Sequence, residues 1–366
     1  MTILLFILGL IGLIAGAELF LKAVDHFGLK WGVSPLIMGL TVVAFATGAP
    51  ELAISIKAAA SGSADLVLGN IIGSNIANIL LILGITSVIA TLNITLRVIR
   101  IDVPIVIGVS AVLFFLAWDG VLTTLDGIIL LAGFIAYSIF TFFQIRKGKE
   151  EDSVDEVFQY EKSIDELAQG SWFYIKNGGF LLVGLALIVL GSNWMVESAV
   201  KIATILGISE LVIGLTIVSI GTSLPEIATS LASARKGNAD IAVANVLGSN
   251  LYNVLLTLGL TLIIAPTVLT VSTDAINLDL PFMVAVSIVC IPIFIAGFNL
   301  TRMDGTIFLF YYITYMAYLV MKSLESPGVE LIEQGMAFVV IPLTIAYMIW
   351  KIYLYRKQLA ETFGAD

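Results

Sequence analysis

The sequence predicts an all-α membrane protein made of two inverted five-helix repeats, ten core transmembrane helices, with an eleventh helix at the C-terminal end. Three observations support this fold class. Apolar segments long enough to cross a bilayer recur along the chain, a polar motif occurs twice at a fixed spacing, and each copy belongs to a half with an odd number of spans.

The composition is that of a membrane protein. Of the 366 residues, 59% are hydrophobic and only 12% are charged, and the mean hydropathy is +1.05. Soluble domains carry about 25% charged residues, so a soluble enzyme is excluded. The net charge of −9 argues against nucleic acid as a partner and leaves the lipid bilayer as the expected surroundings.

Apolar runs of about 20 residues, the length that crosses a bilayer, recur from end to end. We expect helices at 3–23, 33–58, 66–91, 101–118, 126–145, 176–200, 209–234, 241–265, 279–298, 304–322 and 333–354. The first run has no basic segment before it, so it is expected to be a retained helix rather than a cleaved signal peptide.

The two halves of the chain repeat one motif. Residues 39–84 align without a gap with residues 214–259, and about half of the aligned positions are identical. Glu51 and Glu226 differ by 226 − 51 = 175, as do Asn78 and Asn253. Further matches are Asp102-Val103-Pro104 with Asp279-Leu280-Pro281, and Asp126-Gly127 with Asp304-Gly305. Because five spans is an odd number, the second copy enters the membrane from the opposite face.

These boundaries divide the chain into four parts. We expect the first repeat at 1–145, an acidic cytoplasmic linker at 146–173, the second repeat at 174–322, and an additional helix with a cytoplasmic tail at 323–366. The basic residues favour an N-terminus outside and a C-terminus inside. Of 18 Lys and Arg, only Lys57, Lys201 and Lys322 then fall outside, and 18 − 3 = 15 lie on the cytoplasmic side.

The repeated motif places one acid in the middle of a span in each half. An isolated ionised carboxylate there costs several kcal/mol unless it is paired or coordinated. The nearest bases, Lys57 and Arg235, lie toward helix ends. Pro50 and Pro225 directly precede the acids, and a proline frees a main-chain carbonyl one turn earlier. We therefore expect broken helices whose carbonyls face a cation site.

The polar side chains around the acids all offer oxygen. They are Thr47 and Thr222 one turn before the acids, and Ser74, Asn78, Ser249 and Asn253 on the next helices. Small residues there, Gly69, Gly73, Ala244 and Gly248, are expected to let those helices pack closely on the broken ones. The single His26 is expected at a helix interface and the single Cys290 in a packed span. Oxygen ligands favour hard cations such as Ca²⁺ and Na⁺.

Two carboxylates balance one divalent cation. Without a cation, two like charges so close cannot both remain ionised at low cost, so one would hold a proton. The site is therefore expected to hold Ca²⁺, monovalent ions or protons in turn. Mutually exclusive occupancy is the physical basis of ion exchange, and no catalytic chemistry is expected.

At these residues the chain resembles the calcium/cation antiporter superfamily, in particular the prokaryotic sodium/calcium exchangers. The G-T-S-x-P-E motif of that family stands here as Gly221 to Glu226, and as Ala46 to Glu51 in the first copy. The following G-S-N-x-x-N motif stands as Gly73 to Asn78 and Gly248 to Asn253. The inverted repeats of the family cover residues 3–322, most of the chain.

The resemblance implies roles for individual residues. Glu51 and Glu226 would be shared Ca²⁺ ligands, with main-chain oxygens from Thr47 and Thr222. The flanking Na⁺ sites would use Ser74 with Ala44 and Ser249 with Ser219, and the central position would be lined by Asn78 and Asn253. The family works by alternating access, with its first and sixth helices sliding over the rest. Ca²⁺ and Na⁺ are then substrates, and no cofactor is implied.

The resemblance has two departures. Gly48 replaces the usual serine and removes one hydroxyl from the first copy, and Asn253 stands where potassium-dependent relatives carry aspartate. The expected function is an antiporter of a bacterial plasma membrane that exports cytoplasmic Ca²⁺ in exchange for Na⁺. A proton/calcium exchanger of the same fold is the alternative. A cation channel and an intramembrane protease are further rivals, distinguished by passive flux and by peptide cleavage.

Overall fold

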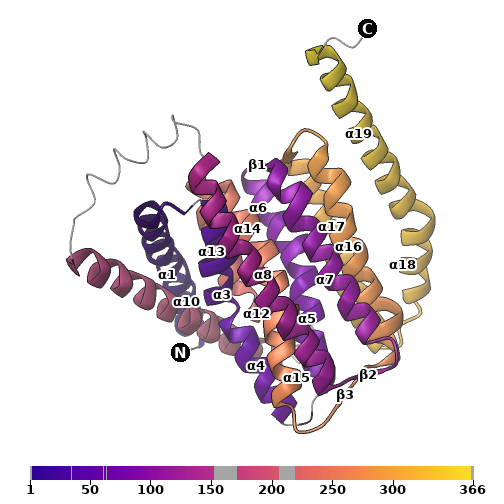
Figure 1. Cartoon of the computed structure of the whole chain (residues 1–366). Helices are drawn as coiled ribbons and strands as arrows, with labels where there is room; N and C mark the ends of the chain where they lie inside the picture. The colour runs from indigo at the N-terminus through magenta and orange to yellow at the C-terminus, as the bar shows by residue number, and fades with distance from the viewer. Residues whose placement is uncertain are drawn as a thin grey trace.

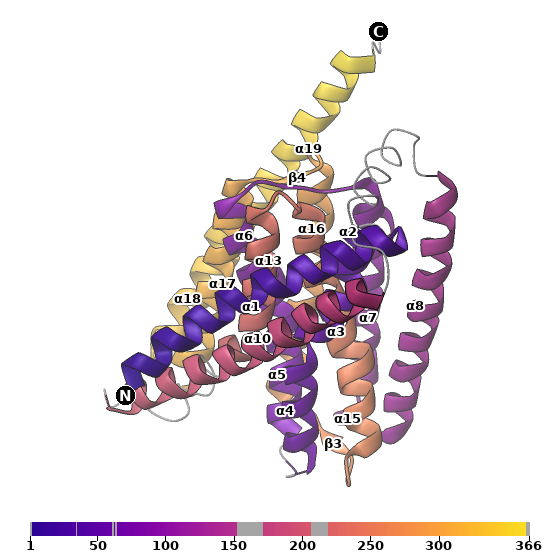
Figure 2. The ribbon, with the colours of Figure 1, turned by 90° about the vertical axis from the view of Figure 1, so that its left-hand side faces the viewer.

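The protein is a bundle of helices in which two short pairs of strands join loops (Figures 1 and 2). The computed structural model describes residues 2–33, 35–60, 62, 64–151, 171–205 and 219–363. In the labels that follow, η denotes a π-helical segment.

The first half contains α1 (Thr2–Trp31), α2 (Pro35–Met38), η1 (Gly39–Val43), α3 (Ala44–Thr47), α4 (Ala49–Ala60), α5 (Ala64–Ala77), η2 (Asn78–Leu83), α6 (Gly84–Ile89), β1 (Leu92–Asn93), η3 (Val98–Asp102), α7 (Val103–Leu116), β2 (Val121–Leu122) and α8 (Thr124–Glu151). The second half contains α10 (Ser171–Ile205), α12 (Ser219–Thr222), α13 (Leu224–Arg235), α14 (Ala239–Leu251), η5 (Tyr252–Leu258), α15 (Gly259–Ile264), β3 (Leu269–Thr270), η6 (Ala275–Asp279), α16 (Leu280–Ile295), β4 (Asn299–Leu300) and α17 (Arg302–Ser323). The chain continues with α18 (Val329–Gly335), η7 (Met336–Val340) and α19 (Ile341–Phe363).

Within the described residues, eight helices are long and apolar enough to cross a membrane, and the bent pair 35–47 with 49–60 adds a ninth. The expected span at 304–322 is the helix α17, which is not among these nine. The expected span at 209–234 lies partly outside the described residues, and so does most of the expected linker at 146–173. The all-helical membrane fold is confirmed.

The short strands show that the halves are inverted. Strand β1 pairs with β4 and β2 pairs with β3, both antiparallel, so each pair joins a loop of one half to a loop of the other. Strands β1 and β3 follow equivalent helices of the two halves, yet they lie at opposite ends of the bundle (Figure 1). Equivalent loops at opposite ends are what an inverted repeat produces.

In the core, each broken helix packs on a helix of the other half. A Cβ at Gly39 would lie 2.7 Å from the Cβ of Ala244, and one at Gly248 would lie 2.8 Å from the Cβ of Ala44. The close packing predicted for Ala244 and Gly248 is therefore confirmed, but their partner is the broken helix of the other half. The prediction for Gly69 was wrong, because no atom lies within 4 Å of the place its Cβ would take.

Helices α1 and α10 form a separate pair that lies obliquely across one side of the bundle (Figure 2). Glycines bring their backbones together. A Cβ at Gly16 would be 2.8 Å from the carbonyl oxygen of Gly184, and one at Gly191 would be 2.6 Å from that of Gly9. Small residues at helix crossings permit this approach in membranes. His26 Nδ1 lies 2.7 Å from Asn177 Oδ1 between the same helices, so its predicted interface position is confirmed.

Candidate ion-binding site

Both acid-bearing segments are broken helices, as the prolines predict. Helix α3 ends at Thr47 and α4 starts at Ala49, with a bend of 42°. In the other half α12 ends at Thr222 and α13 starts at Leu224. Each proline stands in the first turn of the helix after the break, where its missing N–H leaves no helical hydrogen bond unmade. Each acid consequently lies near the positive end of a half-helix.

The two acids are buried in the middle of the bundle. Glu51 is 1% exposed and Glu226 is 2% exposed. Within the described residues neither carboxyl forms an ion pair with Lys, Arg or His. The acid-bearing helix α13 of the second half packs on α3, the segment just before the break that precedes Glu51. The structure thus brings together two acids that stand 175 residues apart in the chain.

Six buried side-chain oxygens of the predicted site make no hydrogen bond to any described residue. They form three symmetric pairs: Oε2 of Glu51 and Glu226, Oγ of Ser74 and Ser249, and Oδ1 of Asn78 and Asn253. A buried polar atom without a partner is costly, and native proteins rarely contain several together. All six atoms can donate a lone pair to a cation, so the residues fit the hard-cation substrate expected from the sequence.

The threonines before the breaks reach across to the other half. The Thr47 hydroxyl donates to Asn245 Oδ1 over 3.4 Å, and the Thr222 hydroxyl donates to Asn70 Oδ1 over 3.5 Å. Thr47 also reaches the Glu226 side chain. Each break is thereby tied to the acid-bearing region of the opposite repeat.

Asn70 and Asn245 are functional candidates that our sequence reasoning missed. Asn70 Nδ2 donates to the main-chain oxygen of Glu51 over 3.2 Å, and Asn245 Nδ2 donates to that of Glu226 over 3.4 Å. Both amides also reach hydroxyls one turn further along, Ser55 at 3.0 Å and Ser230 at 2.9 Å. The signal was present, because 245 − 70 = 175, the spacing of the acids.

Asn78 and Asn253 bond to asparagines of the opposite repeat. Asn78 Nδ2 donates to Asn250 Oδ1 over 2.8 Å, and Asn253 Nδ2 donates to Asn75 Oδ1 over 3.2 Å. Asn78 is the first residue of the π-helical segment η2, and Asn253 lies in η5. Such wide turns often occur at functional sites, where they redirect side chains.

The remaining predicted residues lie beside this cluster or outside the description. Ala44 is fully buried and faces Gly248, the residue before Ser249. Ser219 begins α12, but its side chain lies outside the described residues. Among the residues that are described, no group of three or more His, Cys, Asp or Glu side chains could hold a metal ion. The other residues of the predicted site are threonine, serine, asparagine and alanine, whose oxygens are neutral.

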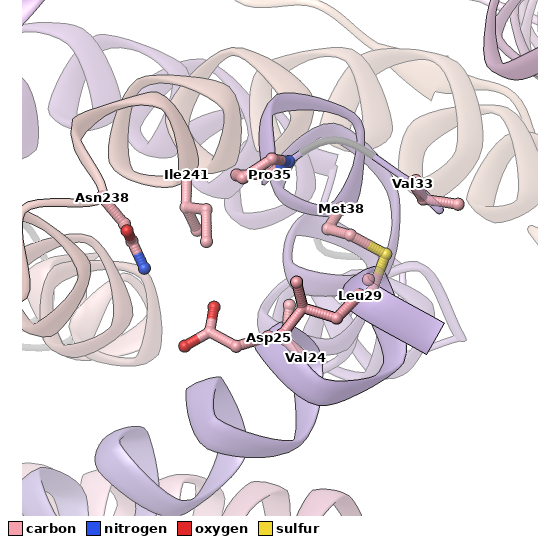
Figure 3. Close-up of a pocket in the computed structure, with 9 residues that line it drawn as sticks. Val24, Asp25, Leu29, Val33, Pro35, Met38, Asn238 and Ile241 are labelled. Atoms are coloured by element: carbon pink, nitrogen blue, oxygen red, sulfur yellow. The ribbon is translucent and has the colours of Figure 1, made fainter. Parts of the chain in front are cut away.

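A separate cavity of about 240 Å³ lies between α1, α2 and the turn before α14 (Figure 3). Asp25 and Asn238 supply its polar side chains, and the rest of its lining is glycine or apolar residues such as Met38 and Ile241. None of the predicted site residues lines it. Cys290 is buried in α16 with its thiol 3.6 Å from the Val286 carbonyl oxygen, so its predicted packed position is confirmed.

Comparison with known proteins places these features in a family. The model of the family "Sodium/calcium exchanger protein" matches residues 1–143 and 176–321. The sodium/calcium exchanger MaX1 of Methanosarcina acetivorans is 32% identical over 344 residues, which cover 86% of this chain and 97% of that protein. The inner membrane protein YrbG of Escherichia coli is 35% identical over 264 residues, which cover 72% of this chain and 79% of that protein.

A solved structure agrees with the same assignment. The sodium-calcium exchanger NCX_Mj superposes with a TM-score of 0.72 at 28% sequence identity, covering 86% of this chain and 97% of that one. The family match itself extends over both halves, and its ranges include the residues of the two broken helices.

Proposed function

The chain belongs to the sodium/calcium exchanger protein family, so it is an antiporter of the membrane rather than an enzyme, and from this premise we propose that it exports cytoplasmic Ca²⁺ in exchange for external Na⁺. The observation that carries the proposal is the symmetric set of six buried oxygens without hydrogen-bond partners among the described residues.

The charge of the site selects the substrate. Glu51 and Glu226 supply two negative charges in a place where the described residues offer no basic partner. One Ca²⁺ neutralises both, and two Na⁺ do the same. Because neither acid can remain charged and alone at low cost, a metal cation or protons must occupy the site at every step, and the proposal assigns Ca²⁺ and Na⁺ to it in turn. Occupancy by one ion then excludes the other.

The individual ligands follow from this charge balance and from the family resemblance. Glu51 and Glu226 share the Ca²⁺, with main-chain oxygens of Thr47 and Thr222 completing its shell. The Na⁺ ions flank that position, one using Ser74 and Ala44, the other Ser249 and Ser219, with Asn78 and Asn253 lining the centre. The hydroxyl and amide oxygens left without partners support these assignments.

Access to the site alternates when the α1–α10 pair slides. The glycine contacts between these helices hold them together as one body, and α1 also packs on the acid-bearing α13. A slide of the pair relative to the rest would uncover the site on one side of the membrane and cover it on the other. We place the N-terminus outside and the C-terminus in the cytoplasm of a bacterial plasma membrane, as the basic residues favour.

The experiment is ⁴⁵Ca²⁺ uptake into proteoliposomes that hold the purified protein. Vesicles preloaded with Na⁺ are compared with vesicles preloaded with K⁺ and with vesicles that carry a pH gradient. The proposal expects uptake that requires internal Na⁺ and ignores the pH gradient. Uptake driven by the pH gradient alone would assign the chain to proton/calcium exchange, and flux without a counter-ion would indicate a channel.

A further inference from the structure

Four asparagines form two hydrogen-bonded chains across the repeat boundary, and the segments η2 and η5 that hold Asn78 and Asn253 pack on the acid-bearing helices α13 and α4. One chain runs from Asn78 Nδ2 to Asn250 Oδ1 over 2.8 Å, and then from Asn250 Nδ2 to the main-chain oxygen of Asn75 over 3.3 Å. The other runs from Asn253 Nδ2 to Asn75 Oδ1 over 3.2 Å, and then from Asn75 Nδ2 to the Met283 sulfur over 3.6 Å. All four asparagines are at most 2% exposed.

The ends of these chains determine which way each amide points. A side-chain amide has an acceptor oxygen on one side and a donor NH₂ on the other, and its hydrogen-bond network decides its orientation. The first chain ends on a carbonyl oxygen and the second on a thioether sulfur, and neither atom can donate. Reversing either chain would set an amide oxygen against another acceptor. Each hydrogen-bonded chain therefore begins with an NH₂ group that donates, that of Asn78 in the first and that of Asn253 in the second.

At the predicted site, this direction of donation leaves two amide oxygens available. The NH₂ groups of Asn78 and Asn253 are used by Asn250 and Asn75, and their Oδ1 atoms have no hydrogen-bond partner in the described part of the chain. We propose that Asn75 and Asn250 are positioning residues that turn the amide oxygens of Asn78 and Asn253 toward the transported cation. This inference rests on the proposed function for the identity of the cation.

The orientation matters because a reversed amide would present the positive end of its dipole to Ca²⁺ or Na⁺. In a buried site such a contact replaces attraction with repulsion. The pairing also crosses the repeats. Asn75 and Asn78 stand three residues apart on one helix, yet each works with a residue of the other half.

The crossing pattern gives a double-mutant test. The variants are Asn75→Leu, Asn250→Leu, Asn78→Ala and Asn253→Ala, measured by the Ca²⁺ concentration for half-maximal ⁴⁵Ca²⁺ binding to the purified full chain. We expect each leucine variant to raise that concentration about tenfold, the loss of one favourable polar contact of about 1.4 kcal/mol. Size-exclusion profiles check folding, and an alanine variant replaces any leucine variant that does not fold.

Combined variants separate positioning from general packing. Asn78→Ala with Asn250→Leu should bind Ca²⁺ no more weakly than Asn78→Ala alone, because Asn250 acts through Asn78. Asn253→Ala with Asn75→Leu should behave in the same way. The same-helix combinations, Asn78→Ala with Asn75→Leu and Asn253→Ala with Asn250→Leu, should multiply to about a hundredfold.

Effects that multiply in all four combinations would overturn the inference, and so would coupling confined to the same-helix combinations. Leucine variants that bind Ca²⁺ as the parent does would also overturn it. The proposed function is tested separately on the unmodified protein. It would be contradicted if that protein neither bound Ca²⁺ nor transported it in exchange for Na⁺, and this is measured before any variant is made.

Discussion

The two acid-bearing breaks have the same backbone and different side chains. Gly48 (φ −78°, ψ 0°) and Ser223 (φ −89°, ψ 5°) occupy equivalent positions and adopt nearly the same conformation, which any residue can take. Glycine is therefore not needed for the bend. The difference is one hydroxyl, since Ser223 Oγ is buried without a hydrogen-bond partner in the described residues. Duplication preserved the backbone of the break, whereas the side chain at this position diverged.

The outer faces of the repeats differ more. Asp126 and Asp304 cap equivalent helices, each accepting from the hydroxyl of a threonine three residues earlier. Among the described residues, Asp304 alone of the two has further partners, Lys351 Nζ at 2.7 Å and Tyr347 OH at 2.7 Å, both on α19. Helix α19 extends away from the core on that side alone (Figure 1). The appended helix is thus attached to the second repeat and remote from the acids.

The largest effect on transport is expected where the repeats are identical. Glu51→Gln and Glu226→Gln should each reduce Na⁺-dependent ⁴⁵Ca²⁺ uptake by more than about a hundredfold, because each removes a full charge from a buried site. The folded protein should persist, and Ca²⁺ should no longer raise its melting temperature in detergent. Near-normal uptake by either variant would contradict the shared site.

A smaller but equally symmetric loss is expected from Asn70→Leu and Asn245→Leu. Each leaves the carbonyl oxygen of its glutamate without this amide donor and removes the amide oxygen that accepts from the threonine hydroxyl of the other repeat. We expect the half-maximal Ca²⁺ concentration to rise about tenfold in both variants, in line with the loss of a buried hydrogen bond. A strong effect in one variant and none in the other would break the symmetry of the site.

Because the two breaks differ by one hydroxyl, removing it from one break and adding it to the other should change the Na⁺ dependence in opposite directions. Ser223→Ala should raise the half-maximal Na⁺ concentration about threefold, and Gly48→Ser should lower it by a similar factor, since each alters one neutral ligand. A Cβ at position 48 would lie 3.1 Å from the Ala44 carbonyl oxygen, a tight contact. Gly48→Ala is therefore the matched control for adding the carbon alone, and equal effects of Gly48→Ala and Gly48→Ser would exclude the hydroxyl as the cause.

The smallest effect on transport is expected at the appended helix. Lys351→Met leaves the fully buried Asp304 carboxylate without its cation and should lower the free energy of unfolding by about 3–5 kcal/mol. Uptake per folded molecule should stay within about twofold of the parent, because the main contacts of α19 within the described residues are with η7 and α16, which hold no predicted site residue. Thermal unfolding in detergent measures the stability.

Lys322→Met is the control for that measurement. Its partner Asp274 is 67% exposed, so this pair should contribute about 0–1 kcal/mol. Comparable destabilisation by both substitutions would contradict the distinction between a buried and an exposed ion pair.

Sequence reasoning was enough to predict the membrane class, the duplication, the position of both breaks and the oxygen-bearing side chains around Glu51 and Glu226. These properties are local, since apolar length, a proline before an acid and a fixed spacing can be read without knowing what packs on what. The inversion followed from counting spans, and the strand pairs at opposite ends of the bundle agree with it.

The fold was needed to show which of these residues bond to each other. The sequence places Ser74, Asn75 and Asn78 on one helix, whereas the hydrogen bonds join Asn75 to Asn253 and Asn78 to Asn250. Periodicity records which face of a helix is polar, but it does not record the partner of that face. The direction of a side-chain amide depends on the donors and acceptors at both of its ends, and those come from segments far apart in the chain.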